Sequence, residues 1–543
     1  MNLAKALRSS SSAAVLLITT AAFALYGDTL RGYFLGDDFG YVWLFRNFSI
    51  TRWPGLFVNE WSQGLWGYNL PELRPFAALA FMVDGKLWGG NASGYRITNF
   101  ALHVLCSWMV FAFARRALLL GGAVAAAAGL LFAVHPAHVE PVVWITGRVD
   151  LLPTAFVLAG LLAFAIFRQS GTRWALVLCW ACYFAAAFSK EYGLVLPLLT
   201  LAYDLTCLPL VRRGETGARG RWLRQLSPYL GFIAVLAIYY LCRSIAFANA
   251  TATAGSSGEL RHVVAQQVEY WRYLLSIEPL AGAWLWAWRS GASTTLLALC
   301  AVGLLAVFTA VALLRAAGPA GSRRLLFSGP LWFVLTTLPF AISYISARHL
   351  YLASAGFSIF VAGAVLGTKR RAWLGWVVLA GVAVLWSYQG FQRTRVWREA
   401  GAISREVNTE LRRLSNLPRG SVLLLHLPSV NGEAPLFVWS SPFLIDRPFL
   451  KPSLRRRVRV LEPPPNYQLG RAWVQKREIA RIAELPENAV AYELGYDFAA
   501  RRVTRRPLDP HRLRSAAQTL REEAAREPGA DPVVLWQRFH AAL

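Results

Sequence analysis

Long apolar runs recur along the chain up to about residue 390, and short polar or charged stretches separate them. A run of about 20 apolar residues is long enough for a helix to cross the hydrocarbon core of a bilayer. The pattern therefore predicts a polytopic α-helical membrane protein with about eleven transmembrane helices. The predicted spans are 11–27, 95–114, 118–134, 150–167, 173–189, 193–210, 227–246, 293–314, 326–346, 349–366 and 372–391.

Three polar regions are longer than simple connections: residues 28–94, residues 247–292 and a tail over residues 392–543. In the tail, runs with strand periodicity alternate with amphipathic stretches, which predicts a small C-terminal α/β domain after a transmembrane domain over residues 1–391. Within the tail, strands are expected at 421–427, 436–439, 458–461 and 489–494, and helices at 396–415, 471–484 and from about residue 511.

Basic clusters occupy every second connection between the predicted spans. Cytoplasmic loops of membrane proteins carry such an excess of Lys and Arg. A cytoplasmic N-terminus puts every cluster inside, and an odd number of spans leaves the tail outside. We therefore expect an integral protein of a bacterial inner (plasma) membrane with its C-terminal domain periplasmic. The clusters are Arg115 and Arg116; Arg168 and Arg173; Arg212, Arg213, Arg219, Arg221 and Arg224; Arg315, Arg323 and Arg324; Lys369, Arg370 and Arg371.

The composition narrows the class of protein. Only 16% of the 543 residues are charged and 56% are hydrophobic, whereas soluble domains carry about 25% charged residues. This excludes an ordinary cytosolic enzyme and a disordered chain. The formal net charge is +26, but no helix-turn-helix, zinc-finger or RNA-stacking signature accompanies it, so we expect no nucleic-acid partner. The expected anionic partners are membrane lipids and phosphate-bearing substrates.

Ionisable side chains at membrane depth are costly and often functional. The first such group is Asp37 and Asp38, in the sequence Gly36-Asp37-Asp38-Phe39 just after the first predicted span. A carboxylate there is a candidate general base toward an acceptor hydroxyl. The alternative interpretation is a helix cap or turn with solvated acids.

A second group crowds the connection between the third and fourth predicted spans: His135, His138, Glu140, Arg148 and Asp150. We expect these side chains to line a cavity that binds phosphate or sugar. A divalent metal held by His138 and Glu140 is the alternative, since both residue types are metal ligands.

Two further groups lie on the same expected outer face. Lys190 and Glu191 follow the fifth span, where a simple interfacial ion pair is the alternative. Arg348 lies in an expected outer loop, whereas the basic clusters lie in expected cytoplasmic loops. Its planar guanidinium matches a phosphate through two hydrogen bonds. Contact with a lipid head group is the alternative. We expect Asp38 and Arg348 to converge on one chamber that opens away from the cytosol and suits a lipid-linked phosphosugar.

Five stretches carry a family resemblance: GDDFGYVWLFRN, LRPFAALAFMVDGKLWGGNASGYRITNFALHVL, HPAHVEPVVWITGRVDLLPTAF, FSKEYGLVLPLLTLAYDL and ARHLYLASAGF. With these stretches the membrane part resembles the transmembrane-and-TPR-containing O-mannosyltransferases and their bacterial relatives, within the GT-C class of polyprenyl-phosphate-sugar glycosyltransferases. The resemblance implies a GT-C-like fold and inverting sugar transfer, with Asp38 (or Asp37) as base. It also implies that Arg74, in LRPF, joins the polar cluster at the donor.

The same resemblance places Lys190, Glu191 and Arg348 around the donor phosphate. The chain departs from the family in three places. Ala347 stands where the family commonly has an acid before the arginine, and Ala353 replaces the proline of the family's Leu-Tyr-Leu-Pro run. The predicted tail also replaces the family's C-terminal helical repeats. The protein acceptors of the family are therefore not assigned to this chain.

The expected function is a membrane glycosyltransferase that moves a sugar from a polyprenyl-phosphate donor to a protein or envelope-glycan hydroxyl on the extracytoplasmic face. The sequence identifies no cofactor with certainty, and a divalent metal stays open as an alternative. The alternatives are a lipid or polysaccharide transporter or flippase, and a non-catalytic envelope scaffold.

Overall fold

The structure is a computed structural model. It describes residues 3–66, 70–207, 218–248, 267, 270–271, 273–275, 318–340, 346–366, 372–437, 441–461, 490–526 and 532–543. The predicted span 293–314, most of the predicted outer loop 247–292 and the predicted helix 471–484 lie outside these residues.

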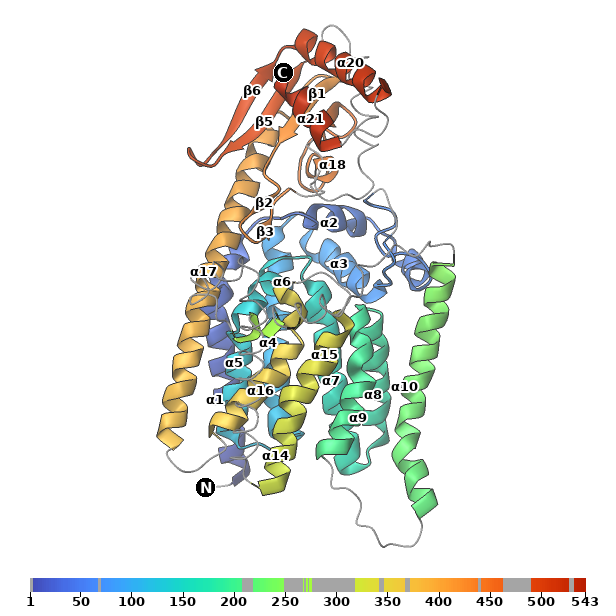
Figure 1. Ribbon diagram of the computed structural model, residues 1–543, viewed down its shortest axis with the longest axis vertical. Coiled ribbons are helices and arrows are strands. Elements are labelled where there is room, and N and C mark those ends of the chain that lie inside the picture. Colours follow the sequence, from blue (N-terminus) through green and yellow to red (C-terminus); the bar gives the residue numbers. More distant parts are fainter. Residues whose placement is uncertain are drawn as a thin grey trace, which may run out of the picture.

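A bundle of helices makes up the lower part of the molecule in Figure 1. Helix α7 lies inside the bundle and packs against α4 and α8, whereas α10 lies at its periphery. The bundle helices are α1 (Leu3–Tyr26), α4 (Ala92–Arg116), α5 (Gly122–Ala133), α7 (Arg148–Ser170), α8 (Arg173–Ala187), α9 (Leu196–Cys207), α10 (Ala218–Ala246), α14 (Gly318–Leu326), α15 (Trp332–Thr337), α16 (Ala353–Leu366) and α17 (Ala372–Arg413).

Within the described residues, five helices are long and apolar enough to cross a membrane, or six if a pair bent by 47° between α5 and Pro136–Val143 counts as one. The prediction of about eleven spans treated every apolar run as one long helix. Several of these runs form shorter or broken helices instead. A π-helical turn, η6 (Phe327–Leu331), separates α14 from α15 and contains Pro330, which cannot supply a backbone N–H to the helix.

The long first polar region folds into short helices across the end of the bundle. Helices α2 (Asp38–Arg46) and α3 (Pro75–Trp88) lie between the bundle and the C-terminal sheet (Figure 1). The 3-10 helix η2 (Ile50–Phe57) packs against α3. Proline at the first position of α3 presets its backbone, and Gly89 ends it with a φ of 58°, a conformation that favours glycine.

The tail carries a four-stranded sheet in the order β4-β1-β5-β6. Strand β1 is parallel to both β4 and β5, and β6 is antiparallel to β5 at the edge. The strands are β1 (Ser421–His426), β4 (Val458–Leu461), β5 (Ala491–Asp497) and β6 (Arg502–Leu508), and a separate pair is formed by β2 (Val430–Asn431) and β3 (Ala434–Pro435). Three of the predicted strands are present, whereas Leu436 and Phe437, predicted as strand, lie just after β3.

Both faces of the sheet are covered. Val422 and Leu424 of β1 pack against α20 (Pro510–Arg526) and α21 (Pro532–Ala541). Leu423 and Leu425 point to the other face and join the hydrophobic core that continues into the bundle. Burial on both faces explains why β1 reads as a continuous apolar run instead of an alternating one.

Helix α17 connects the bundle to the sheet as one continuous element (Figure 1). A span at 372–391 and a separate helix at 396–415 were predicted, so the predicted domain boundary at residue 391 lies inside α17. No proline interrupts this stretch, and its upper half is fixed by side-chain hydrogen bonds. Ser404 donates to the Phe34 carbonyl at 2.7 Å, and Asn408 donates to the Phe449 carbonyl at 3.2 Å.

Candidate active site

A cavity of about 550 Å³ opens at the end of the bundle next to α2 and α3. Four of the five quoted sequence stretches contribute at least one charged residue to its wall. The charged lining residues are Asp37, Glu72, Arg74, Lys190, Glu191 and Arg348, and the aromatic ones include Tyr41, Trp61, Trp66, Trp144, Tyr192 and Phe340. Segments more than three hundred positions apart therefore meet at one chamber. The sequence predicted Asp38 and Arg348 in its wall, whereas the structure places Asp37 and Arg348 there.

The two aspartates have different environments. Asp37 precedes the first residue of α2 and lines the cavity. Successive positions at a helix start point about 100° apart, and Asp38 points into the protein, where it is fully buried. One Asp38 oxygen accepts from the Thr146 backbone N–H at 2.8 Å and from the Thr146 hydroxyl at 2.7 Å, and the other accepts from the Leu35 N–H at 3.0 Å.

Asp38 is not among the residues that line the cavity. Burial raises the pKa of Asp38 to about 6, although the hydrogen bonds from Thr146 and Leu35 favour its ionised form. Its contacts join the start of α2 to the turn before α7. The geometry thus gives Asp38 a positioning role and leaves Asp37 as the carboxylate that a substrate in the cavity can reach.

The turn before the aspartates depends on a glycine. Gly36 has a φ of 51°, and a Cβ there would lie 3.1 Å from the Pro435 side chain. Its N–H donates to the Leu436 carbonyl at 2.7 Å. The segment after β3 therefore packs directly against the loop that presents Asp37, which ties the tail to the cavity.

Arg74 is held between two carboxylates on the cavity wall. It lies 2.9 Å from Glu72 and 3.2 Å from Glu191. Burial opposes ionisation of Glu191, but the Arg74 guanidinium lowers its pKa below the usual value. Two carboxylates therefore flank the single Arg74 guanidinium. Arg74 holds the two acids in place, and its charge is balanced by theirs.

Lys190 and Arg348 form the cationic side of the cavity. Lys190 donates to Asp150 at 2.5 Å, and burial lowers its pKa although Asp150 opposes the shift. The Arg348 Nε lies 3.7 Å from Glu140 and 3.8 Å from Asp150, and the guanidinium sits over the Trp144 ring. The two carboxylates and the Trp144 ring thus orient the Arg348 side chain.

Glu140 and Asp150 support these cations from behind. Glu140 accepts from the Ser346 hydroxyl at 3.0 Å and faces Arg348. Asp150, in the first turn of α7, is fully buried between Lys190 and Arg348. Neither acid is among the cavity-lining residues.

Arg148 lies away from the cavity. It is fully buried, pairs with Asp84 of α3 at 2.7 Å and donates to the carbonyls of Ile145, Ala80 and Tyr95. Its guanidinium also stacks over the Phe81 ring. These contacts hold α3 against the start of α7, so the structure gives Arg148 a structural role in place of substrate binding.

We expect Arg148→Met to destabilise the protein by about 3–5 kcal/mol, because it leaves the buried Asp84 carboxylate without its cation. Equilibrium unfolding in mixed detergent micelles measures the change. The double variant Arg148→Met/Asp84→Leu should recover part of the loss, since an apolar pair of similar volume is tolerated. Wild-type stability in Arg148→Met would contradict the structural role.

The two histidines of the same loop are also buried away from the cavity. His135 Nε2 bonds to the Leu274 carbonyl at 2.9 Å, and its Nδ1 accepts from the Ala137 N–H. His138 Nε2 bonds to the Ser354 hydroxyl at 2.6 Å, whereas Glu140 faces Arg348. Within the described residues no third ligand joins His138 and Glu140, so the geometry does not favour the metal alternative there.

Several cavity residues were not identified from the sequence. Glu72 lies two positions before the recognised Arg74 and could have been found by its place in the same polar run. The tryptophans Trp61, Trp66 and Trp144 carry no motif signal, because a membrane protein contains tryptophan at many interfacial positions. Their convergence depends on tertiary packing.

No family model matches the chain. Among curated proteins, it is 33% identical over 191 residues to the protein O-mannosyl-transferase Tmtc1 of Drosophila melanogaster, covering 33% of this chain and 21% of that protein. It is 30% identical over 281 residues to Tmtc2 of the same organism, covering 48% of this chain and 28% of that protein. The chain thus spans between about a fifth and just over a quarter of the length of these relatives.

Among solved structures, ArnT from Cupriavidus metallidurans bound to undecaprenyl phosphate superposes with a TM-score of 0.52 and 15% sequence identity. The match covers 88% of this chain and 93% of that one. The apo state of the same protein gives a TM-score of 0.51. The chain therefore has an ArnT-like fold, as the GT-C resemblance predicted, and its membrane part is similar in sequence to the TMTC protein O-mannosyl-transferases.

Proposed function

We propose that this chain is an integral membrane glycosyltransferase that transfers a sugar from a polyprenyl-phosphate-linked donor to an acceptor hydroxyl. One observation carries the proposal: Asp37, Lys190 and Arg348 line a single cavity. The similarity to proteins named O-mannosyl-transferases and the ArnT-like fold support it.

The proposed reaction needs one carboxylate as base. Asp37 takes the proton of the acceptor hydroxyl. The hydroxyl oxygen then attacks the anomeric carbon of the donor sugar from the face opposite the phosphate. The bond between that carbon and the phosphate oxygen breaks, and its electron pair leaves with the polyprenyl phosphate. Inversion follows from this single displacement, whereas hydrolases flank the bond with two carboxylates.

The cations stabilise the charge that develops on the leaving phosphate. Arg348 offers a planar guanidinium that pairs with phosphate through two hydrogen bonds. Lys190 lies on the same side, fixed by Asp150. Preorganised charges in a partly dry site stabilise such a transition state more than they do in water.

The proposed face of the membrane is the extracytoplasmic one. Helix α7 begins beside the cavity, which Val149 of its first turn lines, and carries Arg168 in its last turn. Helix α4 likewise ends in Arg115 and Arg116. Basic helix ends favour the cytoplasm, so the cavity opens on the opposite side in this proposal. The membrane is proposed to be a bacterial inner membrane and the acceptor a protein or envelope glycan.

The purified full-length protein in lipid nanodiscs tests the proposal. With polyprenyl-phosphate mannose as the donor, we expect release of polyprenyl phosphate and sugar on a hydroxyl-bearing acceptor, and no turnover with a nucleotide sugar. Mass spectrometry of lipid-linked sugars and envelope glycans in a deletion strain identifies the natural pair. Movement of the donor across a proteoliposome membrane without product would instead support a flippase, and neither activity would support a scaffold.

A further inference from the structure

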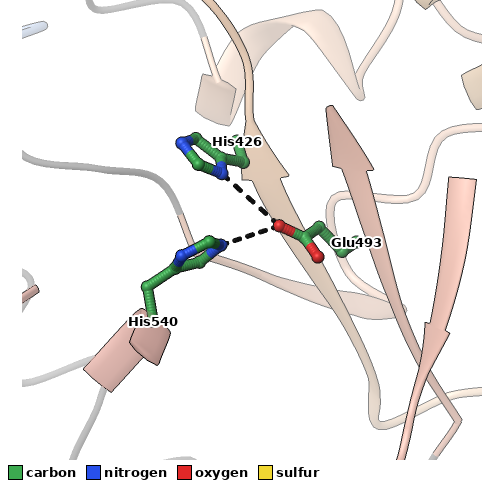
Figure 2. A group of neighbouring side chains, drawn as sticks. All are labelled: His426, Glu493 and His540. Carbon is green, nitrogen blue, oxygen red and sulfur yellow. Dashed lines mark hydrogen bonds and ion pairs between the residues drawn. The ribbon is translucent and has the colours of Figure 1, made fainter. Parts of the chain in front are cut away.

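Three side chains of the tail lie close together, and none of them lines the cavity. His426 ends β1, Glu493 lies in β5 and His540 lies in α21 (Figure 2). One Glu493 oxygen, Oε1, is 3.4 Å from His426 Nδ1 and 2.8 Å from His540 Nε2. Among the described residues this is the one group of three His, Cys, Asp or Glu ligand atoms close enough to share a metal ion, all within 4.8 Å of one another.

The fold itself produces this convergence. In the parallel register Leu424 lies opposite Glu493, and His426 shares the face of Leu424 because side chains alternate along a strand. That face packs against α21 through Trp536 and Phe539. His540 follows Trp536 by four positions, so one turn of helix brings it to the same side.

The carboxylate is oriented for a ligand. Glu493 Oε2 accepts from Arg506 Nε at 2.9 Å and lies 2.7 Å from Arg506 Nη2. Oε1 therefore points toward the two imidazoles. Burial opposes ionisation, but the hydrogen bonds from His540 and Arg506 hold the pKa of Glu493 below its usual value, so the carboxylate is anionic. Hydrogen bonds of this kind fix the ligands of metal sites in place.

The ligand set selects the metal. Two imidazole nitrogens and one carboxylate oxygen suit Zn²⁺, whereas Ca²⁺ and Mg²⁺ require mainly oxygen ligands. Arg506 neutralises part of the Glu493 charge. This further disfavours ions such as Ca²⁺ and Mg²⁺, which depend on the charge of their oxygen ligands. Zinc–ligand bonds of about 2.0–2.2 Å in a tetrahedron separate the ligand atoms by about 3.4 Å. The His426 distance already has this value, and the His540 side chain needs a small outward shift.

We propose that His426, Glu493 and His540 bind one Zn²⁺ ion. Three protein ligands leave a fourth position for water, and the half-exposed His426 side chain (50%) puts this position at the solvent side. The ion links a helix near the end of the chain to two strands of the sheet. The ion thus holds α21 against the sheet. This proposal does not depend on the proposed sugar transfer.

The experiment measures bound metal directly. Full-length protein carrying a tag without histidine is stripped with EDTA, incubated with zinc sulfate, desalted and analysed by mass spectrometry of the metal. We expect about one zinc per chain in the wild type and at least a tenfold lower content in His426→Ala/His540→Ala. His511→Ala is the matched control, because this exposed histidine of α20 lies outside the cluster, and it should retain one zinc.

Two further readouts keep the test decisive. Co²⁺ in place of zinc should give the visible absorption of tetrahedral coordination in the wild type and not in the double variant. Zinc should also slow proteolysis within α21 only when both histidines are present. The same zinc content in the wild type and the double variant, or no zinc retained by the wild type, would overturn the proposal and leave a histidine–glutamate hydrogen-bond cluster.

Discussion

Asp37→Asn is expected to lower the rate of sugar transfer by about 10²–10⁴-fold, the contribution typical of a positioned general base. The amide keeps the size of the side chain and its place at the start of α2, but it cannot take the proton of the acceptor hydroxyl. The rate is measured with a saturating polyprenyl-phosphate donor, so that the loss appears in kcat. Donor binding should change little, because the variant keeps Lys190 and Arg348, the proposed phosphate contacts.

The neighbouring aspartate provides the sharpest control. Asp38→Asn removes an anionic acceptor from the buried hydrogen bonds with Thr146 and Leu35, so we expect a loss of stability in thermal unfolding. Asp28→Asn changes an exposed acid of the 3-10 helix η1 (Gly27–Arg31), which does not line the cavity, and should alter neither property. A fully active Asp37→Asn together with a folded but inactive Asp38→Asn would return the base to Asp38.

The contrast between these two residues shows where sequence reasoning reached its limit. The motif Gly36-Asp37-Asp38-Phe39 predicted a carboxylate near the acceptor, and the four polar groups do meet at one end of the bundle. Which aspartate faces the cavity depends on where α2 begins and on Thr146, 108 positions away. Neither is encoded locally, so the sequence favoured Asp38 while the structure exposes Asp37 to the cavity.

The same reasoning explains the loop residues. His135, His138 and Arg148 are polar groups in an apolar stretch, which favoured a binding site. Their partners are the Leu274 carbonyl, Ser354 and Asp84, each in a distant element. A buried polar residue requires such a partner, but the sequence does not say whether the partner is a substrate or the protein.

In the fold, element type was more predictable than element length. Within the described residues the apolar runs are helical as predicted, but Pro330 and the bend at Pro136 break two of them. Strand β6 was missed because its three arginines, Arg502, Arg505 and Arg506, hide the strand pattern. It lies at the sheet edge, where charged side chains are common. Helix α3 was missed because its 14 residues are too few for a span.

Arg348→Gln is the second variant with a large expected effect. Loss of a charge-assisted phosphate contact costs about 1.5–3 kcal/mol, which corresponds to about a 10- to 100-fold rise in the KM for the donor. Competition by free polyprenyl phosphate should weaken by a similar factor. Arg348→Lys keeps the charge but loses the planar, two-bond geometry, so we expect an intermediate KM.

The surroundings of Arg348 make this variant interpretable. Without the guanidinium, Asp150 still pairs with Lys190 and Glu140 still accepts from Ser346, so neither acid is left without a donor and the fold should persist. Arg398→Gln removes an arginine that pairs with Asp28 outside the cavity and should leave the donor KM unchanged. An unchanged KM in Arg348→Gln, with normal unfolding, would place the donor phosphate at Lys190 and remove Arg348 from the binding site.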